Sequence, residues 1–138
     1  MEHEQIELVE QSFEKVAPIA DTAAELFYAR LFELDPSLKS LFKTDLKAQG
    51  RKLMASITMV VKGLRKPETI VGPVQQLGRR HVEYGVKKEH YDTVGQALLD
   101  TLEKGLGDDF TPEVRHAWEE AYSLLANIMI DASYRKIA

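Results

Sequence analysis

A single inward-facing histidine lies in the segment Leu77-Gly78-Arg79-Arg80-His81-Val82-Glu83-Tyr84-Gly85. It follows Val74 and Leu77 at the spacing of three and four residues that lines one face of a helix, and Gly85 is placed to end that helix. A neutral imidazole on an apolar wall is a good ligand for a buried metal or a metal cofactor. A histidine that is merely hydrogen-bonded in a core gives the same pattern, so the other helices must distinguish the two interpretations.

Length and composition predict one compact domain covering residues 1–138. Of the 138 residues, 44% are hydrophobic, which is enough for a real core. The formal net charge of -4 argues against nucleic acid as the main partner. Because the chain has no cysteine, disulfides, thiolate metal sites and cysteine nucleophiles are excluded.

The apolar segments are too short to predict a membrane span. The longest apolar run, residues 124–130, is broken by Asn127. The first five residues are acidic and polar, which is wrong for a secretion signal. We therefore expect a cytoplasmic protein.

Apolar residues recur at helical spacing along the whole chain, and no segment alternates at period two for long enough to form a strand. The expected fold class is all-α, with about seven helices. Thr22 and Glu25 have the spacing of a capping box, which places the start of the second helix at Thr22. The expected helices cover about residues 6–16, 22–31, 36–42, 46–64, 73–84, 91–106 and 112–132.

Other metal chemistries lack the residues they need. A di-iron bundle requires two inward Glu-x-x-His pairs, and only Glu113-Val114-Arg115-His116 has that spacing. The sequence contains no His-Glu-x-x-His, phosphate loop or glycine-rich nucleotide motif. One inward histidine cannot hold a bare metal, but it can hold an iron already bound by a macrocycle.

A haem requires a proximal histidine, a slot of apolar side chains and polar groups facing the open side of the iron. Residues 49 and 81 are far enough apart in sequence to lie on opposite walls of one pocket, although the spacing alone does not require it. The candidates are Phe42, Leu53, Val94 and Leu98 for the slot, with Tyr28 and Gln49 for the open side. The ordinary alternatives are that the Tyr28 hydroxyl bonds to a backbone carbonyl and that the Gln49 amide is solvated.

In this order along the chain, several fragments match one family. They are Phe27-Tyr28 with Leu31-Phe32, Pro36 to Phe42, Gln49 with Leu53, His81 followed by Tyr91, Val94-Gly95 and Leu98-Leu99, and Trp118, Ala121-Tyr122 and Leu125-Ala126-Asn127. With them the chain resembles the bacterial single-domain globins, which are related to the globin domain of flavohaemoglobins. The resemblance covers essentially the whole chain. It implies a globin fold around haem b, with His81 as proximal ligand, Tyr28 and Gln49 as distal groups, and Phe42 stacked on the haem.

The resemblance leaves two functions open. One is reversible, high-affinity O2 binding for storage or delivery, with NO and CO as further candidate ligands. The other is an NO dioxygenase that converts NO and O2 to nitrate. A sensor is a third class, but sensors usually carry an output domain. Arg79 or Arg80 is a candidate partner for a haem propionate, with a solvated surface position as the alternative.

Two departures from the family pattern bear on redox activity. The glutamate that usually joins the proximal histidine and tyrosine in a hydrogen-bonded triad is replaced by Ser133, and Asp131 does not share its helix face. We therefore expect His81 to donate its second N–H to a backbone carbonyl one turn back, that of Leu77. No reductase domain is expected, so redox turnover would need an external reductase.

Overall fold

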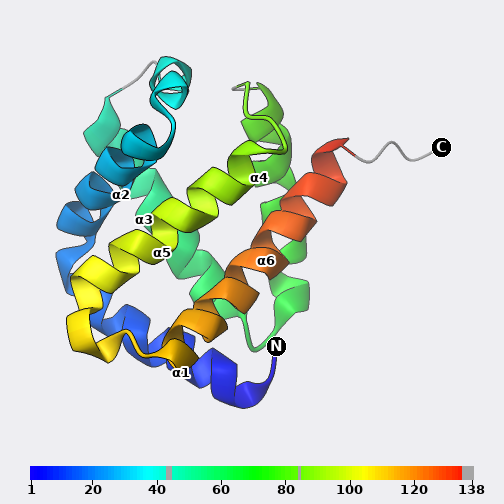
Figure 1. Cartoon of the computed structure of the whole chain (residues 1–138). Coiled ribbons are helices and arrows are strands. Elements are labelled where there is room, and N and C mark those ends of the chain that lie inside the picture. Colours follow the sequence, from blue (N-terminus) through cyan, green and yellow to red (C-terminus); the bar gives the residue numbers. More distant parts are fainter. Residues whose placement is uncertain (43–44, 84, 135–138) are drawn as a thin grey trace.

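The computed structural model describes residues 1–42, 45–83 and 85–134, and gives only the backbone of Glu83, Ser133 and Tyr134. Within these residues the chain is helical and forms no strand, which confirms the all-α prediction (Figure 1). The α-helices are α1 (His3–Val16), α2 (Ala20–Leu34), α3 (Leu46–Gly63), α4 (Val71–Glu83), α5 (His90–Leu106) and α6 (Pro112–Tyr134). Short 3-10 helices are η1 (Ala17–Ile19), η2 (Pro36–Leu41), η3 (Pro67–Thr69) and η4 (Gly107–Asp109). The seventh expected helix is therefore η2, which is 3-10 rather than α.

Local capping sets most helix ends where the sequence predicts them. The side chain of Asp35 accepts a hydrogen bond from the Ser37 N–H at 3.1 Å and opens η2. The Thr111 hydroxyl accepts the Val114 N–H at 3.2 Å and opens α6. Gly85 has φ +91°, a left-handed conformation that only glycine adopts without strain, and it follows the end of α4.

The start of α2 differs from the prediction. The helix begins at Ala20 rather than at Thr22. Pro18 lies in the first turn of η1, where its missing N–H costs nothing, and the Ala20 N–H donates to the Ala17 carbonyl. This 3-10 turn already provides hydrogen bonds for the backbone between α1 and α2. Thr22 therefore lies inside the helix and does not cap it.

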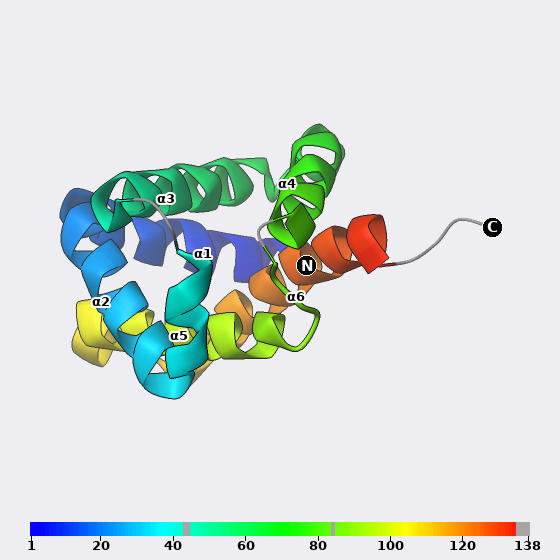
Figure 2. The ribbon, with the colours of Figure 1, turned by 90° about the horizontal axis from the view of Figure 1, so that it is seen from above.

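The helices pack in crossing pairs, α1 and α4 on α6, and α3 and α5 on α2 (Figures 1 and 2). The crossing of α2 and α3 depends on Gly50. A Cβ built on Gly50 would lie 2.9 Å from the Cβ of Ala24, closer than side chains approach in proteins. Only glycine lets the two backbones come this close, and this places the first half of α3 directly over Tyr28.

We expect Gly50→Ala to destabilise the fold by about 1–3 kcal/mol, because Ala24 is buried and its Cβ cannot move without the helix. Gly105→Ala is the matched control. Its added methyl would lie 3.8 Å from Ile19, so the change should be neutral or stabilise the helix by up to ~1 kcal/mol. Urea denaturation of both variants at equal cofactor content measures the difference. Equal stabilities would contradict the close approach.

Polar contacts between distant segments hold two of these crossings. The Trp118 indole N–H donates to the Ser12 hydroxyl at 2.8 Å, and that hydroxyl donates to the Leu8 carbonyl at 2.7 Å, which joins α6 to α1. The Arg30 Nε lies 2.7 Å from Asp100 Oδ2, which joins α2 to α5. No helix among the described residues is long and apolar enough to cross a bilayer.

Candidate functional site

His81 lies in the last turn of α4, and its ring is half-buried. Its Nδ1 is 2.7 Å from the Leu77 carbonyl, which confirms the predicted hydrogen bond. A carbonyl only accepts, so Nδ1 carries the proton and the lone pair of the neutral ring is on Nε2. Burial lowers the pKa of His81, while the bond to Leu77 raises it. The ring is therefore neutral near pH 7 and in the tautomer that a metal ligand requires.

Tyr28 is buried in α2, at the centre of an aromatic group. Its ring centroid lies 5.3 Å from that of Phe42, edge to face, and 6.1 Å from that of Phe32. Within the described residues, its hydroxyl has no hydrogen-bond partner. Burial raises the pKa of Tyr28 to about 12. The phenol therefore remains a proton donor throughout the neutral range, held in place by its aromatic neighbours.

The raised pKa of Tyr28 predicts a loss of stability in alkali. The folded protein holds this proton up to about pH 12, whereas the unfolded chain releases it near the ordinary value of 10.0. Since the unfolded state binds fewer protons in this window, the free energy of unfolding falls as the pH rises from about 10 to about 12. Urea titrations across this range should show a shallower fall for Tyr28→Phe. An identical pH slope would contradict the burial of the hydroxyl.

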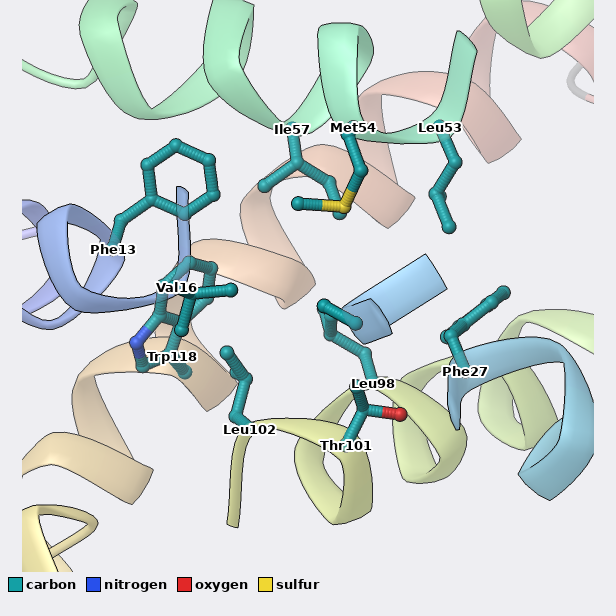
Figure 3. Close-up of a pocket in the computed structure, with 11 residues that line it drawn as sticks. Phe13, Val16, Phe27, Leu53, Met54, Ile57, Leu98, Thr101, Leu102 and Trp118 are labelled. Carbon is teal, nitrogen blue, oxygen red and sulfur yellow. The ribbon is translucent and has the colours of Figure 1, made fainter. Parts of the chain in front are cut away.

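The four slot residues predicted from the sequence come together. Phe42, Leu53, Val94 and Leu98 all pack, partly buried, against the cluster formed around Phe27, Tyr28 and Leu31. Leu53 on α3 and Leu98 on α5 extend toward each other in Figure 3. Between these helices remains an apolar cavity of about 20 Å³, which α1, α2 and α6 close on the far side. These residues are apolar and incompletely covered, as expected for the walls of a crevice.

The polar side chains at this cavity turn their bonding groups elsewhere. Thr101 donates its hydroxyl proton to the Ala97 carbonyl at 2.8 Å, and the Trp118 N–H is bonded to Ser12. The lining of this cavity is therefore almost entirely carbon; of the predicted site residues, it includes Leu53 and Leu98 but not His81 or Tyr28.

The remaining predicted residues have different surroundings. Gln49 lies half-buried on α3, one turn before Leu53. Arg80 is exposed near the end of α4. Tyr91 is buried in the first turn of α5, where its carbonyl accepts the Tyr122 hydroxyl at 2.5 Å. The side chain of Ser133 lies outside the described residues, so the predicted loss of the proximal triad remains a prediction.

The sequence interpretation assigned no role to two residues of this region. Phe32 packs edge to face on Phe42, with ring centroids 5.5 Å apart, and so completes the aromatic group around Tyr28. The sequence could have predicted this contact, since Phe32 follows Tyr28 by four residues and shares its helix face. Leu41 lies next to Gly85, with its Cδ2 3.3 Å from the position of a Cβ there. No local pattern indicates that contact, because it joins the end of η2 to the segment after α4.

The described residues contain no group of three or more His, Asp or Glu side chains able to hold a metal ion. His81 alone would have to supply the protein's bond to a metal. The neutral ring, with its lone pair on Nε2, and the partly covered apolar side chains around Tyr28 fit an iron whose other ligands come from a porphyrin.

The comparisons with known proteins agree with this geometry. Residues 25–129 match the globin family, and the chain belongs to it. The chain is similar to flavohemoproteins of Xylella fastidiosa (33% identical over 129 residues, 91% of this chain) and Deinococcus radiodurans (34% over 130 residues, 92%). It spans about a third of the length of these curated relatives, 32% in each case. The family and these relatives imply haem binding.

Solved structures match along nearly the whole chain. A bacterial globin from Campylobacter jejuni superimposes with a TM-score of 0.84 at 27% identity, covering 95% of both chains. An engineered carbene transferase from Rhodothermus marinus, made from a protein provisionally named nitric oxide dioxygenase, has a TM-score of 0.85 at 26% identity. That match covers 94% of this chain and 90% of the other. The resemblance read from the sequence is thereby confirmed at the level of family and fold.

Proposed function

We propose that this protein contains a haem b globin domain that binds O2 reversibly with high affinity. The observation that best supports the proposal is a neutral histidine in the tautomer of a metal ligand, in a chain that also holds a buried phenol among apolar side chains. His81 is fixed by its 2.7 Å bond to the Leu77 carbonyl, and Tyr28 is fixed as a buried, protonated donor.

Each group has a distinct task in this proposal. When bound, the haem supplies an iron that takes diatomic gases. His81 holds that iron, and the Leu77 carbonyl fixes the plane of the imidazole. Phe42, Leu53, Val94 and Leu98, which pack together around the Tyr28 cluster, would supply apolar contacts to the macrocycle. The Tyr28 hydroxyl, joined by the Gln49 amide, donates hydrogen bonds to the ligand, whose partial negative charge such preorganised donors stabilise. Arg80 at the surface is assigned to a propionate.

The second candidate is an NO dioxygenase that forms nitrate from NO and O2. The similarity to flavohemoproteins and to a protein provisionally named nitric oxide dioxygenase favours it. The same distal donors serve both functions, and the dioxygenase would need its iron to be re-reduced after each turnover.

Absorption spectra test the cofactor and its ligation. We expect the purified protein to be red, with a Soret band that shifts on reduction and again on addition of CO. A colourless protein that takes up no added haem would overturn the proposal.

NO consumption separates the two functions. The O2-saturated ferrous protein is mixed with NO in the presence and absence of a generic flavin reductase with NADH. A single turnover that the reductase cannot make catalytic supports the binding function. Many turnovers at the reductase-limited rate support the dioxygenase instead.

A further inference from the structure

The basic residues of this chain are gathered in two segments. Residues 36–52 and 79–89 together contain nine of the 18 Lys and Arg residues but only three of the 22 Asp and Glu residues. These segments therefore carry a net charge of +6, and the rest of the chain carries -10, which together give the overall -4. Half of the positive charge of an acidic protein is confined to about a fifth of its length.

The fold brings the two segments to the same end of the molecule. Figure 1 shows η2, the start of α3 and the end of α4 together at the upper end as drawn. The segments meet where Leu41 lies against Gly85. They also bear Phe42, Gln49 and His81, which are candidate haem-site residues. We call the described basic side chains of these two segments the basic rim.

The described side chains of the basic rim are exposed and carry unneutralised charge. Lys39, Lys47, Arg51 and Lys52 belong to the first segment. Arg79, Arg80, Lys87 and Lys88 belong to the second. In the part of the chain that the structure describes, none of these eight forms an ion pair.

Several basic residues outside the rim form ion pairs. Lys15 pairs with Asp109, Arg30 with Asp100, and Arg65 with Glu10. Lys47 lies in the first turn of α3, and that turn contains no acidic residue. The helix dipole disfavours positive charge at this end of a helix. The rim charges are thus placed without regard to the stability of the fold, which is typical of a surface that serves binding.

We propose that the basic rim is the docking surface for an acidic electron-donor protein that carries a reduced flavin near a carboxylate-rich face. The proposal rests on the proposed function, because it requires a ferric haem iron that must be re-reduced. The flavin gives up one electron and the ferric iron accepts it, so no other reactant is needed. The two propionates of a haem would neutralise at most two of the eight described charges, and the rim would remain positive.

The charge asymmetry orients such a partner. An acidic protein is attracted to the rim and repelled by the remaining surface, whose net charge is negative. Electrostatic steering would therefore bring the donor to the end of the molecule that carries His81, the residue that would hold the iron. An anionic membrane is a less suitable partner, because its surface would repel the rest of the chain, which carries a net charge of -10.

The test uses the haem-loaded protein and a bacterial flavodoxin as the acidic probe. The dissociation constant is measured by calorimetry, and the rate of haem reduction by reduced flavodoxin is measured by stopped flow. Two rim variants reverse charge, Lys47→Glu with Arg51→Glu, which share one side of α3, and Lys87→Glu with Lys88→Glu. The control variant, Lys62→Glu with Lys104→Glu, reverses two exposed charges that lie away from the rim, near the ends of α3 and α5.

We expect each rim variant to weaken flavodoxin binding and to slow reduction at least about tenfold at low salt. The control should change both by less than about twofold, and reduction by uncharged reduced lumiflavin should be the same for all proteins. Equal effects of the rim and control variants, in proteins that retain haem, would overturn the docking surface and leave the proposed function intact. Failure to retain haem would instead count against the proposed function. Loss of binding to phosphatidylglycerol vesicles by the rim variants, with flavodoxin binding unchanged, would also overturn the proposal.

Discussion

Tyr28→Phe should speed O2 release from the protein about ten- to a hundredfold. The change removes only the hydroxyl, and Phe42 and Phe32 keep the ring in place. A hydrogen bond to a ligand with partial negative charge is worth roughly 1.5–3 kcal/mol, and about 1.4 kcal/mol corresponds to a tenfold change in rate. The O2 dissociation rate constant, measured by stopped-flow displacement with CO, reports this difference directly.

Tyr122→Phe is the matched control for this experiment. It also removes a buried hydroxyl, and burial likewise raises the pKa of Tyr122. That hydroxyl is bonded to the Tyr91 carbonyl between α6 and α5. We therefore expect O2 release within about twofold of the wild type and a loss of stability of about 1 kcal/mol. If Tyr28→Phe behaved like this control, Tyr28 would be a structural tyrosine and the distal assignment would be wrong.

His81→Ala should have the second large effect, which is loss of the protein's bond to the haem iron. The described residues offer no other group of metal ligands, so the affinity for haem should fall by more than about a hundredfold. The Soret band of any haem that remains should shift. Added imidazole should restore much of the original spectrum, because the truncated side chain leaves room for the free ring in an apolar wall.

His116→Ala is the control for the axial ligand. His116 is exposed on α6, where its Nε2 lies 3.9 Å from Glu120. Haem affinity and spectrum should be unchanged in this variant. An unaltered Soret band in His81→Ala would exclude His81 as the ligand, and the proposed function would then have to be abandoned.

Much of the candidate site could be predicted because its parts are local. The bond from His81 to the Leu77 carbonyl joins residues four apart on one helix, a distance that helix geometry alone sets. The inward position of Tyr28 follows from the apolar period of its own helix. The start of α2 was predicted wrongly because Pro18 opens a 3-10 turn that continues from α1 into α2, and this replaces the expected cap at Thr22.

By itself, the sequence determined the helices, most of their ends, and which side chains face inward. These depend on the backbone and on side chains within about four residues, which a linear pattern records. Only the tertiary structure decided that Gly50 lets α3 lie against Ala24, that Tyr122 bonds the Tyr91 carbonyl, and that residues 36–52 and 79–89 meet at one end of the molecule. Those contacts join segments far apart in the chain, so they exist only once the helices have crossed and buried their apolar faces.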